Sequence, residues 1–423
     1  MREYKERVLY HLKRNQQEGI KLLKQLIREK SIQEYENKSQ AIVAEKLRLL
    51  GLKVDIWEPN IKELEKHAYF LSARKNFDGS PNVVGTLKGV GGGKSLILNG
   101  HIDVVPEGDE AQWEFDPYSA KIVNKRLYGR GTSDMKGGNV CMLMALEAII
   151  DSGIQLKGDV YFQSVIEEES GGAGTLATIL RGYTADAVLI PEPTSMKIFP
   201  KQQGSVWFRM TIHGKSAHGG TRYEGVNAIE LSMRVVAHIQ ELEKVRNSRI
   251  TDPLYKGIPI PIPINIGKIN GGTWPSSVAD VVTLEGRMGV APDESMEAAR
   301  EEFEQWMEQL KIDTVFQEYP LTLEWFGARW HPGTIDVNHE FMQALTNNYR
   351  YCLKELPKIE ASPWGTDGGL FTHVANIPTI VFGPGETKVA HHPNEYIDIT
   401  RLHEASEIIA CTILDWCGVH DES

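Results

Sequence analysis

The N-terminal half of the chain alternates between two hydrophobic patterns. Apolar residues recur at helical spacing in residues 17–32, 39–51 and 139–153. Short apolar runs bounded by polar or glycine residues predict strands at 53–59, 82–89, 95–103, 158–169 and 185–193. Because strands that alternate with helices are typical of α/β domains, we expect a mostly parallel central sheet with helices on both faces.

The pattern changes after Gln203 and then returns. Strands are predicted at 204–218, 278–290 and 314–325, and long amphipathic helices at 225–245 and 293–310. This succession favours a small α+β unit with two helices on one face of its sheet. The α/β pattern resumes from about His331, with a buried strand at 377–383 and a final helix at 400–417. We therefore expect a catalytic domain formed by residues 1–202 and 326–423, with residues 203–325 inserted into it.

Composition excludes several classes of protein. A chain of 423 residues with 41% hydrophobic and 24% charged residues is typical of a soluble globular protein with a large core. A net charge of −11 argues against a protein that binds nucleic acid or a membrane surface. There is no apolar run of signal-peptide length or of the roughly 20 residues of a membrane span. The four cysteines have no CxxC spacing and indicate reduced thiols, so we expect a cytoplasmic protein.

Chemically active side chains follow the predicted strands. They are His101 and Asp103 after 95–100, Asp134 in a glycine-rich turn before a helix, Glu167 to Glu169 after 158–166, Glu192 after 185–191, and His391 with His392 after 377–383. The carboxyl ends of parallel strands meet at one edge of a sheet. Each segment alone has an ordinary explanation, such as a helix N-cap at Ser133 or Asp134. Together they form a group of carboxylates that would repel one another unless cations or protons neutralise them, so ordinary explanations for all of them at once are less favoured.

The same segments resemble a known enzyme family. The matching pieces extend over nearly the whole chain in family order: "GHIDVVP", "LYGRGTSDMKGG", "EEESGG", "PEPT", "HGKSAHGG" with "GVNAIE", "GTDGGLF" and "AHHPNEYI". They look like the co-catalytic zinc hydrolases, metallopeptidases and deacylases that include glutamate carboxypeptidase, acetylornithine deacetylase and succinyl-diaminopimelate desuccinylase. The resemblance implies a catalytic α/β domain with an inserted lid domain, which in this family often forms a homodimer.

The resemblance implies two divalent metal ions with assigned ligands. His101 and Glu192 match the ligands of the first ion, Glu169 and a histidine match those of the second, and Asp134 matches the carboxylate that bridges both. The family spacing His-x-x-Asn/Asp-Glu fits "HHPNE" only from His391, so His391 is expected to be that histidine. Nitrogen and oxygen ligands favour zinc, with cobalt or manganese as alternatives.

Two further acids have roles implied by the resemblance. Glu168 matches the general base, which would take a proton from a hydroxide-forming water between the ions and return it to the leaving amine. Asp103 matches the acid that hydrogen-bonds the ligand imidazole of His101 and sets its tautomer. The resemblance would thus explain why an imidazole and a carboxylate stand two residues apart at the end of an apolar strand.

Substrate contacts are expected from the inserted domain. His218 matches a lid histidine that reaches the partner's active site in dimeric relatives, and Arg287 matches an arginine that grips a substrate carboxylate. Three residues in or beside glycine-rich loops are further candidates for a substrate pocket: Trp274, Ser276 and Trp364. Three more aromatic residues lie near the expected return to the catalytic domain: Trp325, Phe326 and Trp330. Ser276 stands where relatives commonly have asparagine.

Several functions remain open for such a small-molecule amidohydrolase. "AHGGTRYEGVNAIE" and the tryptophans favour the deformylase of thiamin salvage, which removes a formyl group from an aminomethylpyrimidine. Acetylornithine deacetylase, or a related N-acyl amino acid deacylase, is the alternative, with Arg287 on the substrate carboxylate. A dipeptidase or carboxypeptidase is also compatible with the motifs. A catalytically silent binding module is the least favoured, since the whole ligand set and the base are present.

Overall fold

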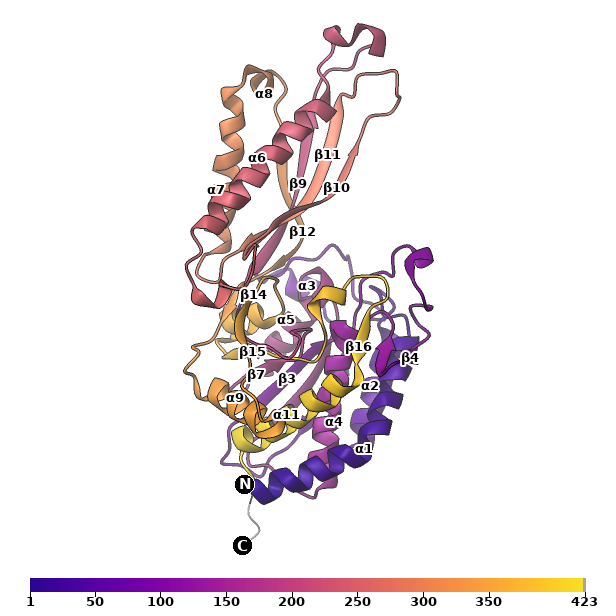
Figure 1. The fold of residues 1–423 in the computed structure, drawn as a ribbon, viewed down its shortest axis with the longest axis vertical. Helices are drawn as coiled ribbons and strands as arrows, with labels where there is room; N and C mark the ends of the chain where they lie inside the picture. Colours follow the sequence, from indigo (N-terminus) through magenta and orange to yellow (C-terminus); the bar gives the residue numbers. More distant parts are fainter. Residues whose placement is uncertain (421–423) are drawn as a thin grey trace. The chain divides into compact units, whose positions relative to one another are not determined.

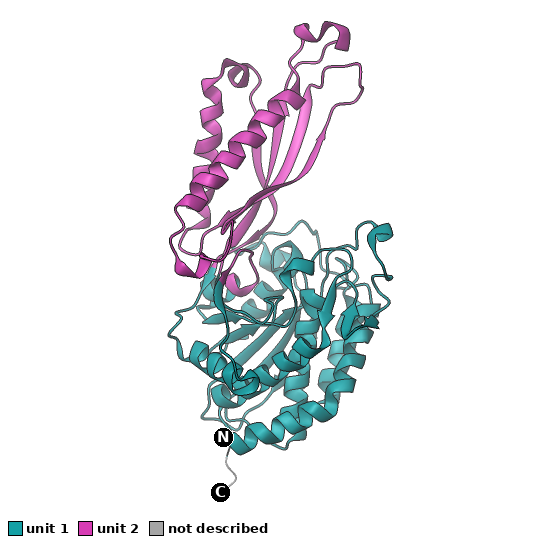
Figure 2. Ribbon diagram, in the orientation of Figure 1, with its two compact units in different colours: residues 1–201, 333–360, 370–423 teal, residues 202–332, 361–369 magenta. Residues whose placement is uncertain are grey.

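The computed structural model describes residues 1–420 and divides the chain into two compact units (Figure 2). Unit 1 contains residues 1–201 and 333–360 and the chain from residue 370 onward, and unit 2 contains residues 202–332 and 361–369. The sequence places the boundary between the inserted domain and the second part of the catalytic domain at residues 325–326. These residues lie inside strand β12 (Thr322–Trp330). The boundary differs because the aromatic residues around this point are part of the strand and pack within unit 2.

Unit 1 is built on a mixed sheet of nine strands, which confirms the α/β class. The path runs β1 (Lys53–Trp57), β2 (Asn82–Leu87), β6 (Val160–Val165), β3 (Leu96–His101), β7 (Val188–Ile190), β15 (Thr379–Val381), β8 (Ile198–Gln202) and β13 (Gly333–Thr334), and β14 (Ile359–Ser362) pairs with β8. The four central strands β6, β3, β7 and β15 are parallel, whereas β1, β2 and β8 pair antiparallel. Every residue of β3 is buried, as expected of a strand covered on both faces.

The helices of unit 1 cover this sheet (Figure 1). They are α1 (Arg2–Arg28), α2 (Asn37–Leu49), α3 (Ile61–Leu64), α4 (Gly137–Asp151), α5 (Ala173–Leu180), α9 (Glu340–Leu353) and α11 (Ile399–Cys417), with the short α10 (Gly368–Leu370) at the unit boundary. Helix α4 packs against α1, α11 and β3 and is buried on nearly all sides. Helix α1 is longer than the predicted 17–32 because Val8 and Leu12 extend its buried apolar stripe. None of the described helices combines the length and apolar character needed to span a membrane.

A small antiparallel sheet lies beside the main one in unit 1. It contains β4 (Lys121–Val123), β5 (Arg126–Tyr128) and β16 (Tyr396–Asp398) in the order β16-β5-β4. This pairing brings the chain after residue 391 next to the chain before Asp134, although the two are far apart in sequence.

Unit 2 is an antiparallel sheet with helices on one face, as the sequence pattern indicated. The strand order is β10 (Ile264–Gly271), β11 (Val281–Val290), β9 (Gly204–His213) and β12. Helices α6 (Ala228–Ser248) and α7 (Met296–Glu308) pack on the buried residues that alternate along β9 and β11. The predicted strand 314–325 is wrong in its first half, because Asp313 caps a short helix, α8 (Thr314–Glu318), before β12 begins.

Candidate metal centre

The parallel strands of unit 1 bring their polar ends to one edge of the sheet. His101 is the last residue of β3, Glu168 and Glu169 form a helical turn directly after β6, and Glu192 follows β7 by two residues. His391 lies in the loop after β15. Because β6, β3, β7 and β15 are neighbours, these side chains converge at their carboxyl ends.

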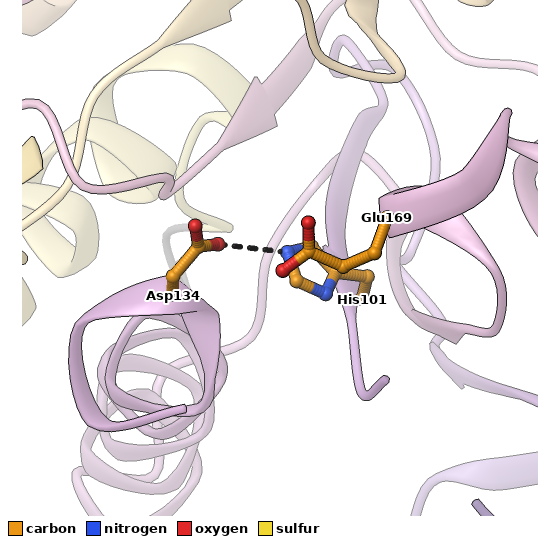
Figure 3. A group of neighbouring side chains, drawn as sticks. All are labelled: His101, Asp134 and Glu169. Atoms are coloured by element: carbon orange, nitrogen blue, oxygen red, sulfur yellow. Dashed lines mark hydrogen bonds and ion pairs between the residues drawn. The ribbon is translucent and has the colours of Figure 1, made fainter. Parts of the chain in front are cut away.

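Asp134 lies between the two imidazoles. Its Oδ1 is 3.1 Å from His101 Nε2, and its Oδ2 is 3.3 Å from His391 Nε2 (Figure 3 shows Asp134 with His101 and Glu169). It comes from the turn Thr132–Lys136 that leads into α4. A carboxylate that faces one imidazole with each oxygen has the geometry needed to bridge two cations.

Each imidazole also has a carboxylate of its own. His101 Nε2 lies 3.7 Å from Glu192 Oε1, and His391 Nε2 lies 3.0 Å from Glu169 Oε2. The structure thus brings together all five residues to which the sequence assigned metal binding. Two overlapping groups have donor atoms within 4.8 Å of one another: His101, Asp134 and Glu169, and His101, Glu168 and Glu192. Glu168 therefore lies beside His101 and Glu192.

The acids and imidazoles of the candidate centre shift one another's pKa values. Burial raises the pKa of Glu192 to about 8, with further repulsion from the Asp134 carboxylate. Burial acts to lower the pKa of His101, but Glu192 and Asp134 raise it well above the ordinary value. Glu169 and Asp134 likewise raise the pKa of His391. The imidazole and carboxylate donors of this cluster are the ones that zinc prefers, and positive charge among them would relieve their mutual repulsion, so the residues fit a divalent cation pair.

Asp103 makes different contacts from those expected. His101 Nδ1 donates to the main-chain oxygen of Asp103 at 2.8 Å, while the Asp103 carboxylate lies 3.7 Å from the ring. That carboxylate instead accepts hydrogen bonds from the backbone N–H groups of Glu168 (3.2 Å) and Glu169 (3.1 Å). Burial raises the pKa of Asp103 to about 7. The imidazole is thus oriented by a carbonyl, and the carboxylate holds the turn that carries the two glutamates.

The three consecutive glutamates have separate environments. Glu167 is fully buried, with a backbone φ of 61° in the left-handed region. Its carboxylate accepts a hydrogen bond from the Ser72 hydroxyl, and burial raises its pKa to about 7. Glu167 therefore contacts a different part of the fold from Glu168 and Glu169, which is consistent with no metal-binding role for Glu167.

The other expected site residues lie in unit 2. His218 is exposed and its Nδ1 accepts the Gly220 N–H at 3.0 Å. A β-bridge joins it to Ser277, and the Gly219 N–H donates to the Ser276 carbonyl at 2.7 Å, so the His218 and Ser276 loops lie side by side.

Arg287 has no hydrogen-bond or ion-pair partner among residues 1–420. It is half-buried on β11, opposite Trp207 of β9. Arg209, two residues from Trp207 along β9, is paired with Glu285 and Glu324. Burial lowers the pKa of Arg287 to about 10. An unpaired, half-buried guanidinium can bind an anion.

The aromatic candidates differ from one another. Trp274 is 69% exposed in the β10–β11 loop, whereas Trp364 is half-buried in a turn closed by the Ser362 hydroxyl. Trp325 is partly buried and packs on Phe208 and Phe303 in the core of unit 2.

Two buried charged residues beside the ligands were missed by the sequence analysis. Arg130 and Glu395 form an ion pair of 2.7 Å with both side chains almost fully buried. The signal was present, because Glu395 ends the His-x-x-Asn/Asp-Glu spacing and Arg130 lies in the "GRG" before Asp134.

Known proteins are similar to this chain in sequence and in fold. The family described as peptidase family M20/M25/M40 matches residues 97–415. The N-formyl-4-amino-5-aminomethyl-2-methylpyrimidine deformylase of Bacillus subtilis (strain 168) is 33% identical over 402 residues, which cover 90% of this chain and 89% of the relative. The Saccharomyces cerevisiae di-peptidase Dug1p has a TM-score of 0.78 at 15% identity, with 98% of both chains covered. The Bacillus subtilis YXEP protein, a dinuclear metal binding peptidase from the M20 family, has a TM-score of 0.61 at 16% identity, with 96% of this chain and 99% of that chain covered.

Proposed function

Because this chain belongs to the peptidase family M20/M25/M40, we propose that it is a metal-dependent amidohydrolase that removes the formyl group from an N-formyl aminomethylpyrimidine, a reaction of thiamin salvage. The observation that carries the substrate assignment is the 33% identity to the Bacillus subtilis deformylase over 90% of the chain. The same family also contains peptidases, so the substrate must be tested directly.

We propose that two divalent ions, zinc in the first place, bind between the five ligands. His101 and Glu192 would hold one ion, His391 and Glu169 the other, and Asp134 would bridge them; the distances of 3.0–3.7 Å between these groups support this division. When bound, such ions lower the pKa of water and polarise an amide carbonyl. A pair of ions also removes the need for the protons that the cluster otherwise holds.

Glu168 is the residue proposed to move the proton. Its position next to His101 and Glu192, together with the backbone hydrogen bond to Asp103, supports this role. A carboxylate there takes a proton from the attacking water and gives it to the nitrogen of the leaving amine. Water and amide are converted to formate and a free amine, and Glu168 returns to its starting state.

The inserted unit is proposed to act as a lid and a dimerisation domain. Strand β10 lies at the edge of its sheet and leaves one row of backbone groups unpaired within the unit. Helix α6 exposes Ile229 (41%) and Met233 (68%) one turn apart, and β10 exposes Ile269 (59%). Exposed apolar residues beside an edge strand support a homodimer through this unit, from which His218 would reach the partner's active site.

Arg287 supports a second candidate function. A half-buried guanidinium without a partner among the described residues would suit the α-carboxylate of an N-acyl amino acid, as in acetylornithine deacetylase. The formylated pyrimidine has no carboxylate. Arg287 should therefore matter for a deacetylase activity and not for a deformylase activity.

A substrate panel separates these candidates. The metal-loaded protein is assayed with N-formyl-4-amino-5-aminomethyl-2-methylpyrimidine, N-acetylornithine, N-succinyl-diaminopimelate and a dipeptide, and kcat/KM is compared. The proposal expects the formylated pyrimidine to exceed all others by tenfold or more. In the Arg287→Met protein, kcat/KM for the pyrimidine should change little. A tenfold preference for N-acetylornithine, lost in Arg287→Met, would replace the deformylase assignment with the deacetylase.

A further inference from the structure

The buried carboxylate of Glu395 is surrounded by hydrogen-bond donors from the Asp134 turn. Its Oε2 accepts from Arg130 Nη1 at 2.7 Å and from the Gly131 N–H at 3.0 Å. Its Oε1 accepts from the Ser133 N–H at 2.8 Å and from the Asp134 N–H at 3.1 Å. The side chain of Glu395 is 0% exposed, so no solvent competes for these contacts. One carboxylate thus holds the backbone of the turn that presents Asp134.

Arg130 extends this contact to two more segments. Its guanidinium donates to the Pro106 carbonyl at 3.3 Å and to the His392 carbonyl at 3.4 Å. It also lies over the ring of Trp113, 5.2 Å from the ring centroid. The Arg130–Glu395 pair therefore connects the chain after His101, the turn of Asp134 and the loop of His391.

The His391 loop needs such a connection. The backbone φ is 61° at His391 and 62° at Asn394, both in the left-handed region that non-glycine residues rarely adopt. Asn394 is held by the backbone of Glu114 and Gln112, and Glu395 by the Asp134 turn. The contacts of two neighbouring side chains thus offset the backbone conformation that places His391.

We propose that Glu395, paired with Arg130, is a positioning residue that fixes Asp134 and His391 relative to each other and so sets the affinity for the second metal ion. This inference rests on the metal-dependent function proposed above. All four groups that face the Glu395 carboxylate are donors, so a glutamine would turn an NH₂ group toward N–H groups. The first ion shares only Asp134 with these contacts, because His101 and Glu192 make no hydrogen bond to Glu395 among the described residues. The second ion depends on both Asp134 and His391, so the first ion should be less affected.

The test is a zinc titration of chelator-treated protein, followed by competition with a chromophoric chelator. Wild-type protein should bind two ions. In Glu395→Gln the dissociation constant of the second ion should rise about 10–100-fold, the usual effect of removing a group that orients a ligand, while that of the first should change less than about threefold. Arg130→Lys keeps the positive charge and should give a smaller rise of the same kind. It also serves as the second variant if Glu395→Gln does not fold.

Glu294→Gln is the matched control. Glu294 is paired with the buried guanidinium of Arg246 at 2.7 Å, in the unit that carries no proposed metal ligand. It should lower the melting temperature without changing either dissociation constant. Two ions bound with unchanged affinity in the Glu395 and Arg130 variants, or equal weakening of both ions, would overturn this inference alone. A wild-type protein that binds no pair of ions would overturn the proposed function as well.

Discussion

At the scale of single residues, Asp103 connects two parts of the metal centre. Its main-chain oxygen accepts the His101 ring N–H, and its carboxylate accepts the N–H groups of Glu168 and Glu169. The backbone of Asp103 thus orients the His101 ring, and its side chain holds the turn that carries Glu168 and Glu169. This division between backbone and side chain can be tested because a substitution at Asp103 keeps the carbonyl and changes only the carboxylate.

Asp103→Asn should reduce kcat about 10–100-fold while the protein still binds its metal ions. An asparagine has one accepting oxygen, and its NH₂ group would face the second backbone N–H, so the turn carrying Glu168 should shift. Metal content by elemental analysis and kcat are measured on the same sample. Asp109→Asn, at an exposed position in the following loop, is the control and should leave both unchanged. Loss of metal in Asp103→Asn would show that the carboxylate orients His101 after all.

The sequence indicated the candidate ligands better than the groups that position them. His101, Asp134, Glu169, Glu192 and His391 were predicted as ligands because each follows a strand signal and because family motifs surround them. The hydrogen bond to His101 could not be foreseen, because a residue name does not reveal whether its carbonyl or its carboxylate faces a ring. Arg130 and Glu395 are 265 residues apart, so the motif around each residue does not reveal that the two are paired.

At the scale of elements, the Asp134 turn is tied to the end of α1 by a buried lysine. Lys136 Nζ donates to the carbonyls of Leu26 at 2.8 Å and Glu29 at 2.9 Å. The last carbonyls of a helix have no partner within the helix and carry its negative dipole end. Lys136 is 0% exposed, and burial lowers its pKa to about 7. The long first helix is thereby joined to the segment that presents Asp134.

Lys136→Met should lower the free energy of unfolding by about 1–3 kcal/mol, because a buried carbonyl is left without its donor. Burial disfavours the charged lysine in the folded state, and this cost is complete below pH 7. It fades as the pH rises toward the unfolded lysine pKa of about 10.4, so the loss relative to wild type should grow between pH 7 and 10. Urea denaturation of the chelator-treated protein measures this, with the exposed Lys21→Met on α1 as control. A loss that shrinks as the pH rises would contradict the assignment.

Elements with strong periodicity were predicted and irregular ones were not. The buried run of β3 and the amphipathic stripe of α6 were identified, since each has one period and clear ends. Strand β10 was missed because proline and glycine surround it in "PIPINIGKINGG". Residues 314–318 were assigned to a strand because threonine, valine and phenylalanine favour strands. In the structure, the Asp313 side chain caps the N-terminus of a helix that begins at Thr314.

At the scale of the whole molecule, the inserted unit carries residues that are expected to contact the substrate. The ligands belong to unit 1, and His218, Arg287 and Ser276 belong to unit 2. If His218 acts across a homodimer, each active centre needs two chains. The exposed apolar residues of α6 and the edge strand β10 would supply the surface for the proposed dimer.

Mixing two inactive variants tests this arrangement. Glu168→Ala lacks the base and His218→Ala lacks the lid histidine, so each homodimer should be inactive. In a mixed dimer one centre has its own Glu168 and receives His218 from the Glu168→Ala chain, so activity should return. Replacing His218→Ala by His213→Ala, an exposed histidine at the end of β9, is the control for general effects on unit 2 and should itself remain active. A verified mixed dimer without activity would assign His218 to its own chain or to structure.

The proposed function has Glu168 carry the proton while a formamide is hydrolysed at the metal centre. The most direct measurement is formate release from N-formyl-4-amino-5-aminomethyl-2-methylpyrimidine by zinc-loaded wild-type and Glu168→Gln proteins, with bound zinc counted in both. The expected result is rapid release by the wild type and a rate about 10²–10⁴-fold lower in Glu168→Gln, with two ions retained in each. An active Glu168→Gln protein, or a wild type that holds two ions and releases no formate, would contradict the account.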